Sequence, residues 1–522
     1  MSWLTIVLSS LMGLLAIFYF FFRKLKKFEK LGILHLRPWP VFGNMGSSLF
    51  KQRLLADVID EVYKLNEDAK YVGFYDFGEP VVVIKSPDLI KNVAIKHFDY
   101  FVDHRGFVHD AEMDPFFGNN LFSLRGDKWK ETRNLLSPAF TGSKMRMMFK
   151  LMSDCGKNFA QFLTEQSSSL GSSEIDAKDA FMRYTNDVIA TCAFGISIDS
   201  MRNRKNEFFV LGKEVVNFEG SLSTKLFLLR SFPRISKIFG IKLIDPAVED
   251  FFINVVRETV ETREREGITR PDMIQLMMET RKNNTGQGLE LSMMDMASEA
   301  FIFFLGGFDT TATLMCFAAH QIAANPLVQQ KLCNEIDHVL ETVENAQVTY
   351  DAINEMEYLD AILNETLRLY PPGFFLDRLC VKPYQLPPAL PGEKPITIQP
   401  GESVWFPVYS INRDSKYFDD PDRWDPERFL GARKNRIDLS IYLPFGLGPR
   451  MCIGNRFALL ETKVMLFHLL SKCHIKPGRK AQVPLKLKKS FIITAEGGFW
   501  LEIEPRNISA NNTKDFSKAS TS

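Results

Sequence analysis

Apolar residues recur at helical spacing through most of the chain, as Leu359, Ile362 and Leu367 illustrate. One of these stretches is unusually long. It begins at Ser292, where a serine followed three residues later by an aspartate can cap a helix, and nothing interrupts it before Pro326. The spacing therefore predicts one long helix among many shorter ones.

Strand-like runs are few and lie at two places. Residues 71–85 predict a β-hairpin that turns around Gly78 and Pro80, and residues 491–505 predict a second that turns around the glycine pair 497–498. No internal repeat and no linker rich in Gly and Ser divides the chain. The pattern therefore predicts a mainly α-helical fold with small β-sheets.

The N-terminus carries a different pattern, because residues 1–22 contain no charge and a basic segment begins at Arg23. Roughly 20 apolar residues at about 1.5 Å each just cross a hydrocarbon core of about 30 Å. A cleaved signal peptide would carry its positive charge before the apolar run and end at small residues, which residues 18–22 do not offer. We therefore expect an uncleaved transmembrane anchor at 1–22, with the rest of the chain in the cytosol.

The segments that flank the main body differ from it in composition. Residues 23–44 are basic and hold two prolines around Trp39, which predicts a stiff, extended hinge. Residues 506–522 are polar apart from one phenylalanine, which predicts a disordered tail. Residues 45–505 are left as one large domain.

Charge and cysteine content narrow the class of protein. Lys and Arg number 64 against 63 Asp and Glu, so the charge balance gives no basis for nucleic-acid binding. The 7 cysteines are too few for a disulfide framework and show no C-x-x-C spacing, which suits a reducing compartment and argues against a zinc cluster. The 45 phenylalanines indicate a bulky core or a large apolar cavity.

A glycine-rich segment with one cysteine, PFGLGPRMCIGN at residues 444–455, precedes a plainly helical stretch at 455–472. Cys452 therefore lies just before a helix N-terminus, where backbone N–H groups and the helix dipole stabilise a thiolate. Arg450 adds a positive charge nearby. A dinucleotide fingerprint is excluded because Met451 stands where it needs glycine. The alternative for a lone cysteine is an inert buried residue.

Two glycines and two threonines stand in the middle of the long predicted helix, in FFLGGFDTTAT at residues 303–313. Glycine there costs up to ~1 kcal/mol per residue relative to a good helix former. The small residues indicate either a close crossing with a second helix or a widened turn with room for a small ligand beside Asp309 and Thr310. The residues alone do not separate these two interpretations.

Phe445, Gly448, Arg450, Cys452 and Gly454 read F-x-x-G-x-R-x-C-x-G, which resembles the haem-ligand signature of the cytochrome P450 superfamily. Four further segments resemble motifs of that family: FLGGFDTT at 304–311, ETLR at 365–368, PERF at 426–429 and WKETR at 129–133. The anchor and proline-rich hinge resemble those of microsomal members, and the chain as a whole is most similar to insect enzymes that metabolise toxins. The resemblance covers nearly the whole chain before the tail.

The resemblance implies the cytochrome P450 fold and a haem b whose iron is held by the Cys452 thiolate, with Phe445 shielding the sulfur and Gly454 as a further haem-binding residue. It also implies a buried group, Glu365, Arg368 and Arg428, that supports the cysteine loop without taking part in catalysis. The partners that it implies for the two haem propionates are Trp129, Arg133, Arg450, Arg378 and Arg105. A guanidinium suits a carboxylate because both are bidentate.

By the same resemblance Asp309 and Thr310 lie on the distal side and relay protons. The reaction implied is RH + O2 + NADPH + H+ → ROH + H2O + NADP+. Because the chain shows no nucleotide site, electrons would come from NADPH–cytochrome P450 reductase, with cytochrome b5 as a further candidate partner. The basic run 433–436, with Lys128 and Lys130, is either part of the docking face or a solvated charged loop.

The implied substrate is a lipophilic small molecule, and the implied location is the endoplasmic reticulum membrane with the catalytic domain on the cytosolic side. The residues that we expect to line the substrate pocket are Phe116, Phe304, Phe308, Phe374 and Thr494, although a phenylalanine is more often part of a core. Toxin clearance and hormone or fatty-acid hydroxylation both stay open. Two rival functions are a haem-thiolate isomerase, which tends to lack the acid–alcohol pair, and a non-catalytic haem-binding sensor.

Overall fold

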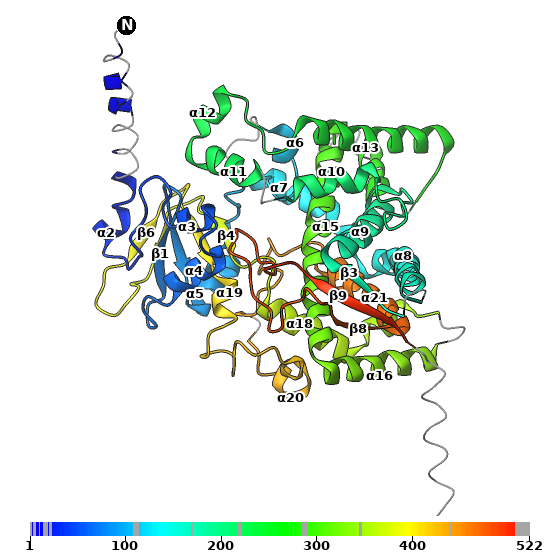
Figure 1. Cartoon of the computed structure of the whole chain (residues 1–522). Helices are drawn as coiled ribbons and strands as arrows, with labels where there is room; N and C mark the ends of the chain where they lie inside the picture. The colour runs from blue at the N-terminus through cyan, green and yellow to red at the C-terminus, as the bar shows by residue number, and fades with distance from the viewer. Residues whose placement is uncertain are drawn as a thin grey trace, which may run out of the picture.

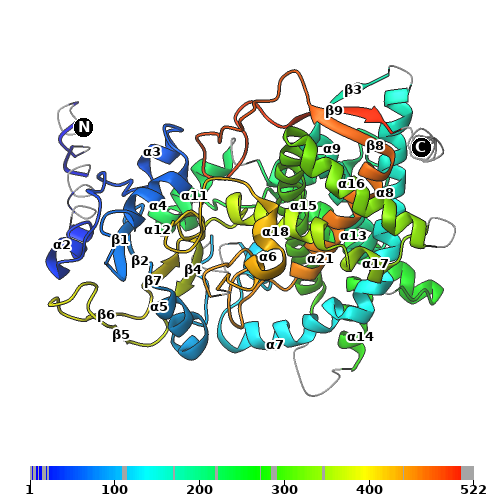
Figure 2. The ribbon, with the colours of Figure 1, turned by 90° about the horizontal axis from the view of Figure 1, so that it is seen from below.

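Helices fill most of the molecule, and the largest β-sheet lies at one side of them (Figure 1). The computed structural model describes residues 3, 7–9, 11–13, 19, 23–107, 114–168, 171–217, 221–270, 272–283, 291–343, 347–438 and 440–506. Seen from below, the largest sheet again lies with α2 (Lys27–Leu31) on the side opposite the long helices (Figure 2). The predicted mainly α fold with small sheets is confirmed.

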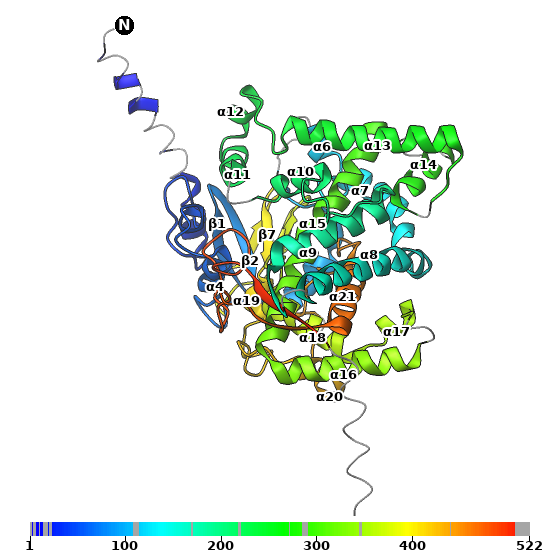
Figure 3. The same ribbon diagram turned by 45° about the vertical axis from the view of Figure 1, so that its right-hand side comes forward.

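The long helix predicted after Ser292 is α15 (Met293–Ala324), which runs through the middle of the helical region (Figure 3). Its start is a capping box, since the Asp295 N–H donates to the Ser292 hydroxyl and the Ser292 N–H donates to the Asp295 carboxylate. The helix ends at Asn325, directly before Pro326. This prediction is confirmed at both ends.

The helices around α15 bury its apolar side chains. Those that pack against it include α9 (Ala177–Ile189), α13 (Pro246–Glu266), α18 (Glu357–Leu369) and α21 (Asn455–Lys472), and α8 (Gly142–Ser168) packs in turn on α21. The other described helices are α2 (Lys27–Leu31), α3 (Gly46–Leu49), α4 (Leu55–Tyr63), α5 (Pro87–Lys91), α6 (Pro115–Gly118), α7 (Gly126–Leu136), α10 (Glu207–Val215), α11 (Ser221–Ser231), α12 (Pro233–Ile238), α14 (Met273–Asn283), α16 (Pro326–Thr342), α17 (Tyr350–Asn354), α19 (Val408–Ile411) and α20 (Gly431–Lys434).

Phenylalanine rings form much of the contact between α15 and its neighbours. Phe252 of α13 lies 5.1 Å from Phe301 and 5.1 Å from Phe304, measured between ring centroids, and both partners belong to α15. Aromatic rings at such distances add to the free energy gained by burying their large apolar surface. A large share of the phenylalanine content therefore serves the core.

The first predicted hairpin is confirmed. β1 (Tyr71–Asp76) pairs antiparallel with β2 (Glu79–Ile84), and the turn is Phe77–Gly78. Pro80 belongs to β2 rather than to the turn, but it precedes the pairing with β7, so its missing N–H removes no hydrogen bond to that neighbour. The sheet order is β1-β2-β7-β4, with β7 (Ser403–Phe406) and β4 (Leu376–Leu379).

The second predicted hairpin is wrong. β9 (Trp500–Pro505) pairs with β3 (Ser173–Asp176) on one side and β8 (Cys473–Pro477) on the other, whereas Ala495 forms only an isolated bridge with Leu487. The chain leaves α21 directly into β8, which places a neighbouring strand beside β9. A third, two-stranded sheet consists of β5 (Tyr384–Leu386) and β6 (Ile396–Ile398).

The segment predicted as an extended hinge is only partly extended. It contains the helix α2 and a tight turn in which Trp39 and Gly43 exchange two backbone hydrogen bonds of 2.8 Å. Phe28 of α2 packs so closely on β1 that a Cβ at Gly73 would lie 2.5 Å from its ring. The segment therefore packs on the sheet as part of the fold.

The predictions for the two ends of the chain fall largely outside the described residues, since 507–522 and most of 1–22 are not among them. Within the described part, α15 is the helix whose length and apolar composition would suit a membrane span. Most of α15 is buried inside the protein, so we interpret it as a core helix.

Candidate active site

The loop that carries Cys452 is held in a tight conformation just before α21. The Cys452 N–H donates to the carbonyl of Phe445 at 2.8 Å, and the backbone at Gly448 has a φ of +75°. A Cβ at Gly448 would lie 2.1 Å from the Ala94 carbonyl oxygen, so only glycine fits there. Gly454 is the N-cap residue of α21. The sequence pattern thus places Cys452 two residues before the N-cap of a helix.

Cys452 is the exposed cysteine in this chain, whose 7 cysteines all lie within the described residues. Burial raises the pKa of its thiol, whereas a backbone N–H at Gly454 and the Arg133 guanidinium lower it. A thiol that is crowded by protein and yet reached by solvent lies in a recess. Cys473, in contrast, is fully buried in β8 and hydrogen-bonded to Thr164, as expected of a packing residue.

The two glycines of α15 serve different purposes. A Cβ at Gly307 would lie 2.8 Å from Ile189 of α9, so the helices cross closely there. A Cβ at Gly306 would meet nothing within 4 Å, and both Gly306 and Thr310, one turn later, are exposed on a largely buried helix. The helix is regular throughout this stretch, and the Thr310 hydroxyl donates to the Gly306 carbonyl. Of the two interpretations, the close helix crossing is therefore confirmed at Gly307. The widened turn is wrong, because the helix is regular there, although open space does lie beside Gly306.

Asp309 and Thr310 lie on different faces of α15. The Asp309 carboxylate forms an ion pair of 2.8 Å with Lys178 of α9, and Lys178 also donates to the Thr313 hydroxyl at 2.6 Å. Successive residues of an α-helix are about 100° apart around its axis, so Asp309 faces α9 while Thr310 faces the open space. The structure therefore does not bring the predicted acid–alcohol pair together on one face.

Two of the predicted propionate partners, Arg450 and Trp129, meet beside the cysteine loop. The Arg450 guanidinium stacks on the Trp129 ring at 4.0 Å and donates to the Val102 carbonyl at 2.7 Å and to the Asp103 carboxylate at 3.2 Å. Burial lowers the pKa of Arg450 to about 9, although Asp103 opposes that shift. Arg133 lies half-buried on the same helix as Trp129, one turn further on.

Arg378 and Arg105 are buried and only partly paired. Arg378 donates to the Asp377 carbonyl at 2.8 Å, and burial lowers its pKa to about 10. Arg105 forms a 2.9 Å ion pair with Asp76, which also pairs with Arg230 of α11. Within the described residues, Nε of Arg378 and Nη2 of Arg105 have no hydrogen-bond partner. Both side chains therefore keep an unpaired buried donor.

The predicted supporting residues form one buried network. Arg368 donates to both carboxylate oxygens of Glu365, at 2.7 and 2.8 Å, and neither side chain is exposed. Arg428 approaches the same carboxylate at 3.4 Å from the short helical turn η6 (Pro426–Phe429). Arg368 also donates to the carbonyls of Asn412 and Pro421, both at 2.7 Å. The network joins α18 to the chain segments that precede the cysteine loop.

The predicted pocket residues mostly pack in the core. Phe304 and Phe308 stack on each other at 4.8 Å and turn toward α10 and α13, on the side of α15 opposite Gly306 and Thr310. Phe116 packs on Phe301, Phe374 on Phe375, and Thr494 is half-buried. We therefore interpret Phe304 and Phe308 as core residues and leave them out of the pocket.

Residues 35–502 match the protein family described as Cytochrome P450. The chain belongs to the cytochrome P450 family. Relatives of this P450 include Cytochrome P450 9e2 of Blattella germanica, 44% identical over 506 residues, and Probable cytochrome P450 9f2 of Drosophila melanogaster, 38% identical over 493 residues. These alignments cover 92% of this chain and 94% and 95% of the relatives. The predicted similarity to insect members of the family is confirmed.

A cytochrome P450 is a monooxygenase that binds haem through an axial cysteine thiolate. The residues of this P450 fit such a group. An accessible thiol lies beside a helix N-terminus, open space lies beside Gly306, and buried arginines keep unpaired donors that suit carboxylates. No cluster of three or more His, Cys, Asp or Glu in the described ranges offers a rival metal site.

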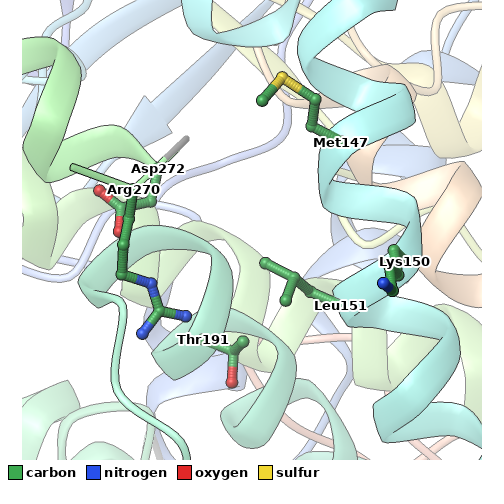
Figure 4. A pocket seen from close by; sticks show the side chains of 6 residues that line it. All are labelled: Met147, Lys150, Leu151, Thr191, Arg270 and Asp272. Carbon is green, nitrogen blue, oxygen red and sulfur yellow. The ribbon is translucent and has the colours of Figure 1, made fainter.

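Several neighbours of this site could not be predicted from any motif. Lys178 is a single lysine 131 residues from Asp309, and Arg230 lies on a helix that no motif marks. A cavity of about 260 Å³ also lies away from the predicted residues of the P450, with Arg270 on one side and Met147 and Leu151 of α8 on the other (Figure 4). None of the predicted site residues lines this cavity.

Proposed function

We propose that this protein inserts one oxygen atom of O2 into lipophilic substrates, with Cys452 as the haem ligand and electrons delivered from NADPH by a reductase. The observation that carries the proposal is the exposed Cys452 thiol before α21, together with the open space beside Gly306. Haem bound through a thiolate supplies the activation of dioxygen at its iron. The protein supplies the binding groups, the orientation and the protons.

The haem carboxylates would be bound by the cationic residues around the cysteine loop. Arg378 and Arg105 each keep a buried donor free, and Trp129 with Arg450 forms one rigid wall. Arg133 is placed to serve either a propionate or the thiolate, since its charge already lowers the pKa of Cys452. Charge-assisted hydrogen bonds of this kind are roughly twice as strong as neutral ones.

Protons would reach the open space from the side of α15 that faces α9. The side chains of Asp309 and Lys178 are 20% and 25% exposed, so they can exchange protons with solvent. Thr310 faces the open space and holds its hydroxyl proton toward the Gly306 carbonyl. A proton would pass from the Asp309–Lys178 pair by way of water to Thr310. Such a relay delivers protons without admitting bulk solvent.

Electrons would come from NADPH–cytochrome P450 reductase, with cytochrome b5 as a further candidate, because the sequence shows no nucleotide-binding motif. The exposed residues Lys128, Lys130 and Arg436 suit an acidic partner. Arg433 lies 3.0 Å from Asp425 and Lys434 lies 3.7 Å from Asp360, so part of the positive charge is already compensated. We infer location on the cytosolic side of the endoplasmic reticulum, with the anchor at 1–22.

The substrate class that we favour is foreign lipophilic compounds, such as insecticides or plant toxins. Its support is the similarity to insect members of the family and the apolar character of the surroundings of α15. Hydroxylation of a hormone or fatty acid is the alternative.

The test is reconstitution of the full-length protein with the reductase in phosphatidylcholine vesicles, under ¹⁸O2 and with a panel of lipophilic compounds. We expect NADPH-dependent products that carry one ¹⁸O atom. Turnover of a hydroperoxide without NADPH would favour the isomerase, and the absence of any oxygen-dependent NADPH consumption would favour the sensor. Either result would overturn the proposed function.

A further inference from the structure

α15 carries a buried carboxyl group, Glu299, that the proposed reaction does not use. The side chain is 1% exposed, and its Oε2 accepts the backbone N–H of Leu121 at 3.1 Å. Its other oxygen, Oε1, has no hydrogen-bond partner within the part of the chain that the structure describes. Burying a carboxyl group with one unpaired oxygen is costly, so the position calls for an explanation.

Glu299 lies on the same stripe of α15 as the open space. It precedes Gly306 by seven residues and Thr310 by eleven. At about 100° and 1.5 Å per residue, the three residues fall within about 20° of one line, with Glu299 about 16 Å along the helix from Thr310. Glu299 therefore stands on the face of α15 that meets the open space, about three turns before Thr310.

The residue that Glu299 holds is also held from the opposite side. Leu121 belongs to the loop at 119–125 between α6 and α7, and its carbonyl accepts from Arg450 at 3.4 Å. The Leu124 carbonyl accepts from Arg450 at 2.8 Å. One short loop thus connects α15 to the cysteine loop, and α7, which carries Trp129, begins directly after it.

We propose that Glu299 is a positioning residue that fastens the 119–125 loop to α15 and so fixes the wall formed by Trp129 and Arg450. This inference rests on the proposed function, because the position of the wall affects activity only if the wall borders a bound haem. Glu299 acts through the loop and touches no reacting atom.

The charges around Glu299 are consistent with its neutral form at neutral pH. Burial raises the pKa of Glu299 to about 8, and the negative charge of Asp295 on the same helix adds to this shift. The Leu121 N–H opposes it. Charged groups of the segments packed beside it include Asp114 at the start of α6, Arg125 at the end of the loop, which donates to the Arg105 carbonyl at 3.0 Å, and Arg450, which reaches the far side of Leu121. In the opened loop the carboxyl group ionises near its ordinary pKa of 4.5, so opening becomes easier as the pH rises from there toward about 8 and changes little above that.

The test uses hydrogen–deuterium exchange of the haem-loaded protein, followed in peptides that cover the 119–125 loop. Glu299→Gln keeps an acceptor oxygen, whereas Glu299→Leu removes it at similar volume. The matched control is Glu461→Gln, because the side chain of Glu461 in α21 is also fully buried and its carboxylate oxygens have no hydrogen-bond partner in the described ranges. We expect at least a tenfold loss of protection in Glu299→Leu, and near wild-type protection in Glu299→Gln and in the control at pH 5.

The pH dependence separates positioning from general packing. Between pH 5 and 8 the protection factor of the wild-type loop should fall, while that of Glu299→Gln should stay constant. In parallel, Glu299→Leu should raise KM for substrate several-fold with little change in kcat. Equal loop protection in all variants, or the same pH profile for wild type and Glu299→Gln, would overturn the inference. If wild-type protein lacks NADPH-dependent turnover, the proposed function fails instead, and the exchange data still decide whether Glu299 holds the loop.

Discussion

Replacing Arg368 with Met tests the buried network beneath the cysteine loop. The substitution keeps most of the side-chain volume but removes the guanidinium that pairs with Glu365 at 2.7 and 2.8 Å. Breaking a buried ion pair from one side costs about 3–5 kcal/mol, because the remaining charge stays buried without its partner. Arg368→Met also leaves the carbonyls of Asn412 and Pro421 without this donor, and each unsatisfied buried group costs about 1–3 kcal/mol.

The expected loss is therefore at least about 4 kcal/mol, which is a large part of the ~5–15 kcal/mol by which a typical protein is stable. Unfolding in guanidinium chloride, followed by circular dichroism, measures this loss of stability. Arg428→Met is the matched control, since Arg428 reaches Glu365 only at 3.4 Å and should cost about 1–2 kcal/mol. A cost below ~1 kcal/mol for Arg368→Met, or a larger cost for the control, would refute the reasoning.

Three further predictions address the helix α15 and the pH dependence. Thr310→Ala should leave NADPH oxidation intact but divert it to peroxide, because the hydroxyl that faces the open space is lost. Thr311→Ala, a change at a buried neighbour, should keep NADPH oxidation coupled to product formation. Equal peroxide yields in the two variants would contradict this role of Thr310. Gly306→Ala should raise the free energy of unfolding by about 1 kcal/mol in chemical denaturation, because alanine favours a helix and its Cβ meets open space; a destabilised variant would show that the space is filled. Burial lowers the pKa of His468 to about 3, below its unfolded value of about 6.5, so the stability that it contributes is present above pH 6.5 and is lost on acidification. Between pH 7 and pH 5, the free energy of unfolding of wild-type protein should therefore fall by about 2 kcal/mol more than that of His468→Gln, as measured by urea titration. Equal decreases in the two proteins would contradict this prediction.

Local signals in the sequence predicted those parts of the fold whose causes are local. The capping box at Ser292 and the stop at Pro326 gave both ends of α15, because capping and proline act within a few residues. The prediction of the second hairpin failed because β9 pairs with β8 and β3. β3 is distant from β9 in the sequence, and a loop separates β8 from β9. Strand pairing over long distances leaves no mark within either strand.

The same limit applies to the site. Motif spacing marked Cys452, Trp129 and Arg450, and the structure brings the last two into contact. Motif spacing did not predict that Asp309 pairs with Lys178, since that contact depends on how α9 crosses α15. Nor did it reveal Glu299, because a carboxylate on an apolar helix is recognised as buried and neutral only once its neighbours are known.

The carbon monoxide difference spectrum of the reduced protein, recorded for wild type and Cys452→Ser, tests the central claim most directly. If the Cys452 sulfur binds the haem iron, wild type shows the red-shifted band that a thiolate ligand produces, and Cys452→Ser loses it. Cys473→Ser should keep the band, since that thiol is buried in β8 away from the recess. Retention of the band in Cys452→Ser, or its loss only in Cys473→Ser, would contradict the account.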